Sequence, residues 1–357
     1  MAIHRLAVIP GDGIGGEVVA AGLEVLEALQ ARDPDLTLEV TQFDWGSDYF
    51  RAHGRMMPED GVDQVRGFDA ILFGAVGDPE LPDDLTLWGL RLALCQGLDQ
   101  YANVRPARLL PGVRSPLAGV GPEELDWVIV RENSEGEYAG AGGRVHRGLP
   151  EEVGMEVAVF TRAGVERIMR FAFDLARNRP RKHLICVTKS NAQRYGMVLW
   201  DEVFAATAEG YPDVRTEKIL VDAMTTRMVL QPGSVDTVVA TNLHADILSD
   251  LAAALSGSLG TAPTANLDPE RRSPSMFEPI HGSGFDITGK GIANPIATFW
   301  SAAMMLEHLG EDKASGTLMA AIERVMASGT QTPDLGGTAS TAEVTAAVCG
   351  NIAGQNA

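Results

Sequence analysis

The sequence has few of the features that mark secreted or membrane-spanning proteins. Its three cysteines, Cys95, Cys186 and Cys349, are odd in number and widely spaced, so they form neither a disulfide framework nor a C-x-x-C zinc motif. The longest apolar helical run, residues 295–309, is too short to span a bilayer and is expected to be a core helix. Residues after Met1 lack the apolar stretch of a signal peptide. We therefore expect a cytoplasmic protein that binds no membrane.

Positive charge is also scarce. The chain has 29 lysines and arginines against 48 aspartates and glutamates, a formal net charge of −19. Nucleic acid and anionic membranes would be repelled by such a surface, so neither is expected as a partner. An anionic substrate would be repelled at long range as well. Any site for one therefore needs its own cluster of arginines. Only five of the basic residues are lysines.

The pattern along the chain indicates an α/β protein. Hydrophobic residues make up 45% of the sequence, and short apolar runs alternate with longer helical patterns, without repeats. Strands that are apolar on both faces and separated by helices predict a largely parallel sheet. The clearest strand candidates are residues 69–74, 127–130, 183–188, 219–221 and 237–241.

Polar side chains follow four of these strands directly. They include Arg131, Lys189, Asp222 and, a few residues after the last strand, Asp246. Ligands of open α/β sheets bind beyond the carboxyl ends of the strands. We therefore expect a site there, built from a base, cations and several carboxylates.

Two of the carboxylates, Asp246 and Asp250, are four residues apart and share one face of a predicted helix. Asp222 could add a third from a neighbouring strand end. Oxygen ligands in this number suit Mg²⁺ or Mn²⁺. The alternative is that Asp246 is a helix N-cap and Asp250 a solvated acid.

Four other residues are candidates for binding or proton transfer. Arg105 and Arg131 could grip an organic acid bidentately, although a structural ion pair is the commoner role for a single arginine. Lys189 could act as a general base if burial or a metal lowers its pKa, and otherwise it is a surface lysine. Tyr138 could donate a proton or simply pack.

A G-x-G-x-x-G pattern formed by Gly11, Gly13 and Gly16 lies between the first strand and the first helix. Such a turn can bind a pyrophosphate through backbone N–H groups. Asp12, however, would place a carboxylate beside that pyrophosphate, and Pro10 removes a donor. The turn is therefore interpreted as a tight strand–helix connection and not as a Rossmann site.

Taken together, the motifs resemble the β-decarboxylating dehydrogenases of metal-bound 2-hydroxy acids, which include isocitrate, isopropylmalate, tartrate and D-malate dehydrogenases. The resemblance covers nearly the whole chain. It implies a two-lobed, mostly parallel α/β fold with a larger cofactor domain, residues 1–100 plus 256–357, and a smaller substrate, metal and dimerisation domain, residues 101–255. The stretches that carry it are residues 9–14, 103–106, 130–138, 188–191, 242–250, 278–283 and 292–295.

The resemblance also implies roles for particular residues. Arg105 and Arg131 would bind the substrate, Tyr138 and Lys189 would transfer protons, and Asp222, Asp246 and Asp250 would hold Mn²⁺ or Mg²⁺. A homodimer is implied, in which the partner subunit supplies Lys189 and Asp222 to each site. The residues implied to hold the cofactor are Glu278, His281, Gly282, Ser283, Asp286 and Asn294. Asp286 favours NAD, because a carboxylate accepts from ribose hydroxyls and repels a 2′-phosphate.

The substrate pocket differs from that of the isopropylmalate and isocitrate members. They have an arginine where this chain has Cys95, and Trp88 stands where they admit a substrate side chain. Both changes favour a four-carbon acid, D-malate or a tartrate, oxidised and decarboxylated with NAD. The alternatives are a 3-isopropylmalate dehydrogenase and a non-catalytic regulatory subunit. The sequence does not choose between D-malate and the tartrates, or between Mn²⁺ and Mg²⁺. It also leaves open a need for K⁺ and the path of the Gly284-Phe285 loop.

Overall fold

The computed structural model describes residues 2–354, and the chain divides into two compact units. The first comprises Met1–Gln100, Arg108–Pro122 and Ala253–Ala357, and the second comprises Tyr101–Ala107 and Glu123–Ala252. The expected domain boundaries differ from this division for residues 108–122 and 253–255, which group with the first unit. The reason is local packing: Arg108 pairs with Glu323 at 2.6 Å, and the Gly112 carbonyl accepts a hydrogen bond from Gln331 at 3.0 Å.

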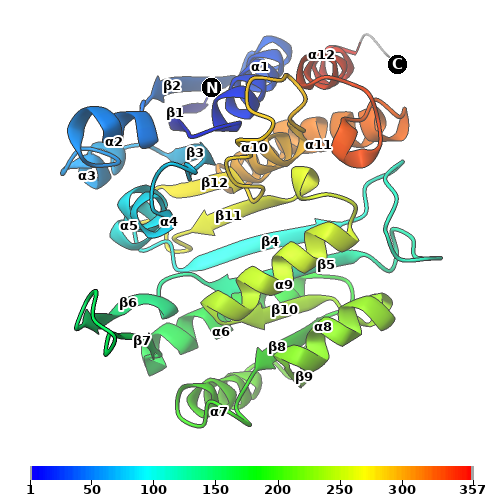
Figure 1. Ribbon diagram of the computed structural model, residues 1–357. Coiled ribbons are helices and arrows are strands. Elements are labelled where there is room, and N and C mark those ends of the chain that lie inside the picture. Colours follow the sequence, from blue (N-terminus) through cyan, green and yellow to red (C-terminus); the bar gives the residue numbers. More distant parts are fainter. Residues whose placement is uncertain (1, 355–357) are drawn as a thin grey trace. The chain divides into compact units, whose positions relative to one another are not determined.

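The first unit is built on five strands in the order β2-β1-β3-β12-β11 (Figure 1). Strands β2, β1, β3 and β12 are parallel to their neighbours, whereas β11 runs antiparallel to β12. The bounds are β1 Ala2–Gly11, β2 Leu36–Gln42, β3 Ala70–Ala75, β11 Pro263–Leu267 and β12 Ser275–Pro279. Leu6 to Ile9 in β1 and the whole of β3 are buried, as expected for strands that are covered on both faces.

Four long helices of this unit, α1, α10, α11 and α12, pack against one another. The apolar run at residues 295–309 forms α10, whose side chains are buried around most of its circumference, so the core-helix prediction is confirmed. The bounds are α1 Gly15–Arg32, α10 Ile296–His308, α11 Asp312–Ala327 and α12 Thr341–Ile352. The shorter helices are α2 Ser47–His53, α3 Gly61–Val65, α4 Asp83–Thr86, the π-helical turn η1 Leu87–Arg91, α5 Leu92–Gly97, and the 3₁₀ turns η3 Leu259–Thr261 and η4 Pro333–Leu335.

The second unit has five strands in the order β4-β5-β10-β8-β9, of which β5, β10, β8 and β9 are parallel to their neighbours. The strand bounds are β4 Ala102–Arg108, β5 Asp126–Glu132, β8 His183–Thr188, β9 Arg215–Leu220 and β10 Thr237–Ala240. The helices are α6 Arg162–Asn178, α7 Gly196–Ala208, α8 Val221–Leu230, the 3₁₀ turn η2 Pro232–Ser234 and α9 Asn242–Leu255. A separate antiparallel hairpin is formed by β6 Gly136–Val145 and β7 Val153–Val159.

These elements confirm the predicted α/β class with mostly parallel strands. Each of the five strand candidates overlaps an observed strand. Of the polar residues expected after them, Arg131 lies inside β5, Lys189 directly follows β8, Asp222 lies in the first turn of the helix after β9, and Asp246 lies in the helix after β10. Among residues 2–354, no helix is both long enough and apolar enough to cross a membrane.

Candidate functional site

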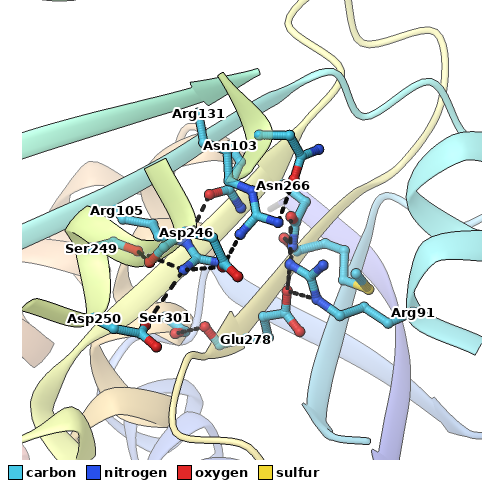
Figure 2. A network of polar contacts seen from close by, with 12 residues as sticks. Arg91, Asn103, Arg105, Arg131, Asp246, Ser249, Asp250, Asn266, Glu278 and Ser301 are labelled. Carbon is cyan, nitrogen blue, oxygen red and sulfur yellow. Dashed lines mark hydrogen bonds and ion pairs between the residues drawn. The ribbon is translucent and has the colours of Figure 1, made fainter. Parts of the chain in front are cut away.

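Asp246, in the second turn of α9, is the centre of a polar cluster in the second unit (Figure 2). Its carboxylate accepts hydrogen bonds from Arg131, from Arg105 at 3.2 Å and from the Tyr138 hydroxyl at 3.3 Å. The two arginines come from β5 and β4, and Tyr138 comes from β6. Four sequence-predicted site residues therefore meet within one unit, although they are spread over more than a hundred positions.

Both arginines are held in place by side chains that the sequence reasoning did not single out. Arg131 is 2% exposed and donates through Nε and Nη2 to the Asn242 amide oxygen at 3.0 and 2.6 Å. Arg105 donates to Asn103 at 2.9 Å and to the Ser249 hydroxyl at 2.7 Å. The only signal for Asn103 and Asn242 was their place inside motifs of the family. These contacts fix the direction of each guanidinium before a ligand arrives.

Asp250 lies one helical turn after Asp246, and its negative charge has weaker contacts with the arginines. Its side chain is 57% exposed, and one oxygen lies 3.9 Å from Nη1 of Arg105. Desolvation raises the pKa of Asp250 and Arg105 opposes that shift, whereas the charge of Asp246 adds to it. A divalent cation would relieve the repulsion between these two carboxylates, so the donor set fits one. Because Asp246 lies inside α9, which begins at Asn242, the alternative of an N-cap role is wrong.

Lys189 and Asp222 form a second polar group in this unit. Lys189 follows β8, Asp222 lies in the first turn of α8, and their side chains are paired. Hydrogen bonding by Lys189 lowers the pKa of the Asp222 carboxyl. In residues 2–354, no three histidine, cysteine or acidic side chains of one chain come close enough to share a metal ion.

In the first unit, the glycine-rich turn is closed by contacts within the protein. The Asp12 carboxylate accepts hydrogen bonds from Ser47 and from the backbone N–H of Gly77, at 2.7 to 2.9 Å. The N–H groups of Asp12 and Ile14 donate to the carbonyls of Ala75 and Ser283 at 2.9 and 2.8 Å. Backbone donors that could otherwise face a pyrophosphate are thus used within the protein. This geometry supports the interpretation of the turn as a structural connection.

A cavity of about 490 Å³ lies beside this turn. That volume is typical of pockets for small molecules and cofactors. His281, Asp286 and Asn294, three of the predicted cofactor residues, line it, together with Ile14 and Asp334. Asp334 accepts from Asn294 at 3.0 Å and was missed by the sequence reasoning, because it follows the distant helix α11.

Within the cavity, His281 has an unsatisfied polar atom. Its Nδ1 contacts the Gly282 carbonyl at 2.8 Å, while its buried Nε2 finds no hydrogen-bond partner within residues 2–354. Burial lowers the pKa of His281, which keeps the ring neutral. A neutral imidazole with one open nitrogen suits the edge of a nucleotide base. The Gly284 backbone has a φ of +47°, so the loop path uses a conformation that favours glycine.

The fold and these two groups of residues define a dehydrogenase of the isocitrate/isopropylmalate class. The family model "Isocitrate/isopropylmalate dehydrogenase" matches residues 5–348, and the chain belongs to this family. The chain is 69% identical to a "Probable tartrate dehydrogenase/decarboxylase" of Agrobacterium vitis over 353 residues, which are 99% of each chain. It is 51% identical to the D-malate dehydrogenase [decarboxylating] of Escherichia coli K12, covering 98% of both.

Among solved structures, isocitrate dehydrogenase from Methylococcus capsulatus superimposes with a TM-score of 0.88 at 36% identity, over 98% of this chain and 99% of that one. The predicted family, fold class and enzyme class are therefore confirmed. The roles of the individual site residues stay predictions, because similarity of whole chains does not test them.

Proposed function

We propose that the protein catalyses the NAD-dependent oxidation and metal-assisted decarboxylation of a four-carbon 2-hydroxy diacid, either D-malate to pyruvate and CO₂ or a tartrate. The observation that carries this proposal is the pair of buried guanidiniums, Arg105 and Arg131, beside the carboxylates of Asp246 and Asp250. Such a group suits an organic acid that binds arginines and a cation at once. The names of the two relatives support the same reaction.

Within this proposal, the chain's own residues divide the work. Arg105 and Arg131 hold the substrate carboxylates, and their buried partners keep them oriented. Lys189 accepts the proton of the substrate hydroxyl, and Tyr138 donates a proton to the carbon that has lost CO₂. Asp222, Asp246 and Asp250 hold Mn²⁺ or Mg²⁺, which would stabilise the negative charge that develops on the substrate oxygens. A further requirement for K⁺ is tested in the assay below.

The cofactor proposed for the first unit is NAD, in the cavity lined by His281, Asp286 and Asn294. Asp286 would accept from the ribose hydroxyls and disfavour a 2′-phosphate. Gly282 and Ser283 belong to the same loop, and the Ser283 carbonyl holds the glycine-rich turn. Glu278 lies at the end of β12, three residues before His281.

The preference for a four-carbon acid rests on Cys95 and Trp88. Cys95 is 1% exposed and lies in an apolar cluster with Met56, Leu90 and Leu94, so it offers no charge to a substrate. Trp88 is 38% exposed, which leaves its ring free to narrow a pocket. Loss of one cationic contact and a smaller pocket both disfavour 3-isopropylmalate and isocitrate.

The proposed assembly is a homodimer with shared active sites. The hairpin β6–β7 exposes apolar side chains that a monomer would leave in water: Val145, Leu149, Val153, Met155 and Val157 are 44% to 55% exposed. A two-stranded hairpin of this kind is marginal without a partner surface. Lys189 and Asp222 pair with each other, and within residues 2–354 they do not complete a metal site with other acidic side chains. This agrees with a dimer in which each subunit supplies these two residues to the site of the other.

The proposed location is the cytoplasm, and the proposed partners are the small-molecule substrate and a second copy of the chain. Within residues 2–354 the three cysteines form no disulfide, and Cys95 and Cys186 are buried, as suits a reducing compartment. The net charge of −19 argues against nucleic acid.

The test is NADH formation by the purified protein with Mn²⁺ or Mg²⁺, with and without K⁺, on D-malate, the tartrates, 3-isopropylmalate and isocitrate. Activity confined to four-carbon acids and abolished by a chelator is the expected result. Preference for 3-isopropylmalate would keep the reaction and refute the Cys95/Trp88 argument. No NADH with any acid would instead favour a non-catalytic regulatory subunit.

A further inference from the structure

Arg91 and Glu278 form a buried ion pair in the first unit, at the edge of the proposed cofactor residues (Figure 2). Arg91 is the last residue of the π-helical turn and is 9% exposed, and Glu278, near the end of β12, is 4% exposed. Arg91 donates from Nε to Oε1 of Glu278 at 2.8 Å, and its Nη2 lies 2.7 Å from the same oxygen. Two charges taken out of water in this way are costly unless they are paired and hydrogen-bonded.

Asn266 of β11 completes the arrangement. Its amide nitrogen donates to Oε1 of Glu278 at 2.7 Å, and its amide oxygen accepts from Nη2 of Arg91 at 3.3 Å. Asn266 and Glu278 lie on adjacent antiparallel strands, with Thr264 directly opposite Glu278. Each member of this triad therefore contacts the other two, and the rigid sheet holds two of them.

The contacts that Arg91 and Asn266 make with Glu278 all involve one of its oxygens, Oε1. Its other oxygen, Oε2, accepts no hydrogen bond from any of residues 2–354 and is not sealed in the interior. One carboxylate oxygen accepts all the protein hydrogen bonds, and the other is available to a ligand. This arrangement is typical of a ligand-binding carboxylate. An acceptor in this state can take a hydroxyl or an amide N–H from a bound molecule without first breaking a protein contact.

We propose that Arg91 and Asn266 are positioning residues that hold Glu278 so that its free oxygen accepts a hydrogen bond from the bound dinucleotide. This inference rests on the proposed function, which assigns Glu278 to the cofactor. Arg91 also places a positive charge against the buried carboxylate. Cys95, one turn later, lies among apolar side chains, whereas Arg91 points toward Glu278. The wide turn that ends at Arg91 is of a kind often found at functional sites.

The central experiment replaces Arg91 by methionine, which keeps much of the side-chain volume and removes the charge. R91M should raise the KM for NAD by about tenfold, while the KM for the acid substrate changes less than about threefold.

Three further variants separate positioning from general damage. R91K should give a smaller loss than R91M, since it keeps the charge and loses the forked guanidinium. E278Q should weaken NAD binding by itself, and R91M added to E278Q should cost little more, because Arg91 acts through the Glu278 charge. R108M is the matched control: it removes an arginine that pairs with Glu323 in the same unit, and it should leave the KM for NAD unchanged.

Independent, fully additive effects of R91M and E278Q would overturn the proposal. A rise in the KM for the acid alone would also overturn it, since Arg91 would then be a substrate ligand. NAD binding is measured in parallel by isothermal titration calorimetry without the acid. If the wild type binds NAD but turns over none of the acids, the proposed function fails while the Arg91 inference is still tested by these binding constants.

Discussion

Asp12 accepts hydrogen bonds from both the backbone N–H and the hydroxyl of Ser47, at 2.7 and 2.8 Å. These bonds join the glycine-rich turn to the start of α2, and a third bond from Gly77 at 2.9 Å joins it to the segment after β3. Asp12 is 6% exposed, so the carboxylate is a buried structural acceptor.

Replacing Asp12 by alanine should lower the free energy of unfolding by about 3 kcal/mol, because three donors lose a charged acceptor. S47A removes only the hydroxyl and should cost about 1 kcal/mol. Urea unfolding followed by circular dichroism measures both. Equal effects for the two variants would show that the Asp12 carboxylate is not what joins these segments.

Gly13 and Gly16 belong to the same motif but should tolerate alanine very differently. A Cβ on Gly13 would lie 1.9 Å from the Ser283 carbonyl oxygen, and its φ is +58°, whereas a Cβ on Gly16 would meet nothing within 4 Å. G13A should displace the cofactor loop and raise the KM for NAD more than about tenfold. G16A should leave it within about twofold. A large effect of G16A would revive a phosphate role for the motif.

Asn242 should prove as important for the acid substrate as the arginine it holds. N242A removes the acceptor for two N–H groups of Arg131, so the guanidinium loses its fixed direction. We expect the KM for the acid to rise about tenfold with the KM for NAD unchanged. R177M, which breaks an ion pair with Asp213 elsewhere in the same unit, is the control. The measurement is steady-state kinetics in which each substrate is varied in turn. Parallel changes in both KM values would indicate misfolding and contradict the prediction.

His308 should make the protein less stable in mild acid. Burial beside Arg271 lowers the pKa of His308 to about 4, whereas the unfolded chain protonates near pH 6.5. The unfolded state therefore binds more protons below pH 6.5, and stability falls as pH drops from there toward 4. Between pH 7 and pH 5 the loss from this partly exposed ring is about 1–2 kcal/mol.

The measurement is urea unfolding of wild type, H308Q and H53Q at pH 7 and pH 5. H308Q cannot take up the proton, so its loss between the two pH values should be smaller than that of the wild type. H53Q, at an exposed histidine, should follow the wild type. Identical losses in all three proteins would assign the acid sensitivity to other groups.

The alternation of buried strands and helices could be predicted from the sequence, because strands covered on both faces must be apolar throughout. The positions of Arg131, Lys189, Asp222 and Asp246 near strand ends followed from the same pattern. Motif spacing was specific enough to identify the family, which the match over residues 5–348 confirms. The core helix at residues 295–309 was predicted from composition alone.

The partners of these residues depended on the tertiary structure. Asn242 and Ser249 orient arginines that are more than a hundred residues away, and Asp334 approaches Asn294 from beyond α11. Spacing along a chain carries information about contacts within one helix or strand, and none about which distant amide faces a given guanidinium. The grouping of residues 108–122 with the first unit could not be predicted from the sequence for the same reason.

The sequence by itself thus determined the class of the protein and the kinds of residue at its site, because local periodicity and motif spacing are written along the chain. Only the tertiary structure decided which groups are free to bind a ligand. In the glycine-rich turn, the N–H groups of Asp12 and Ile14 already donate to Ala75 and Ser283, while Glu278 keeps one oxygen open beside Arg91. Whether a donor or acceptor already has a hydrogen-bond partner depends on which residues lie beside it in space. Those neighbours are brought together only by the fold.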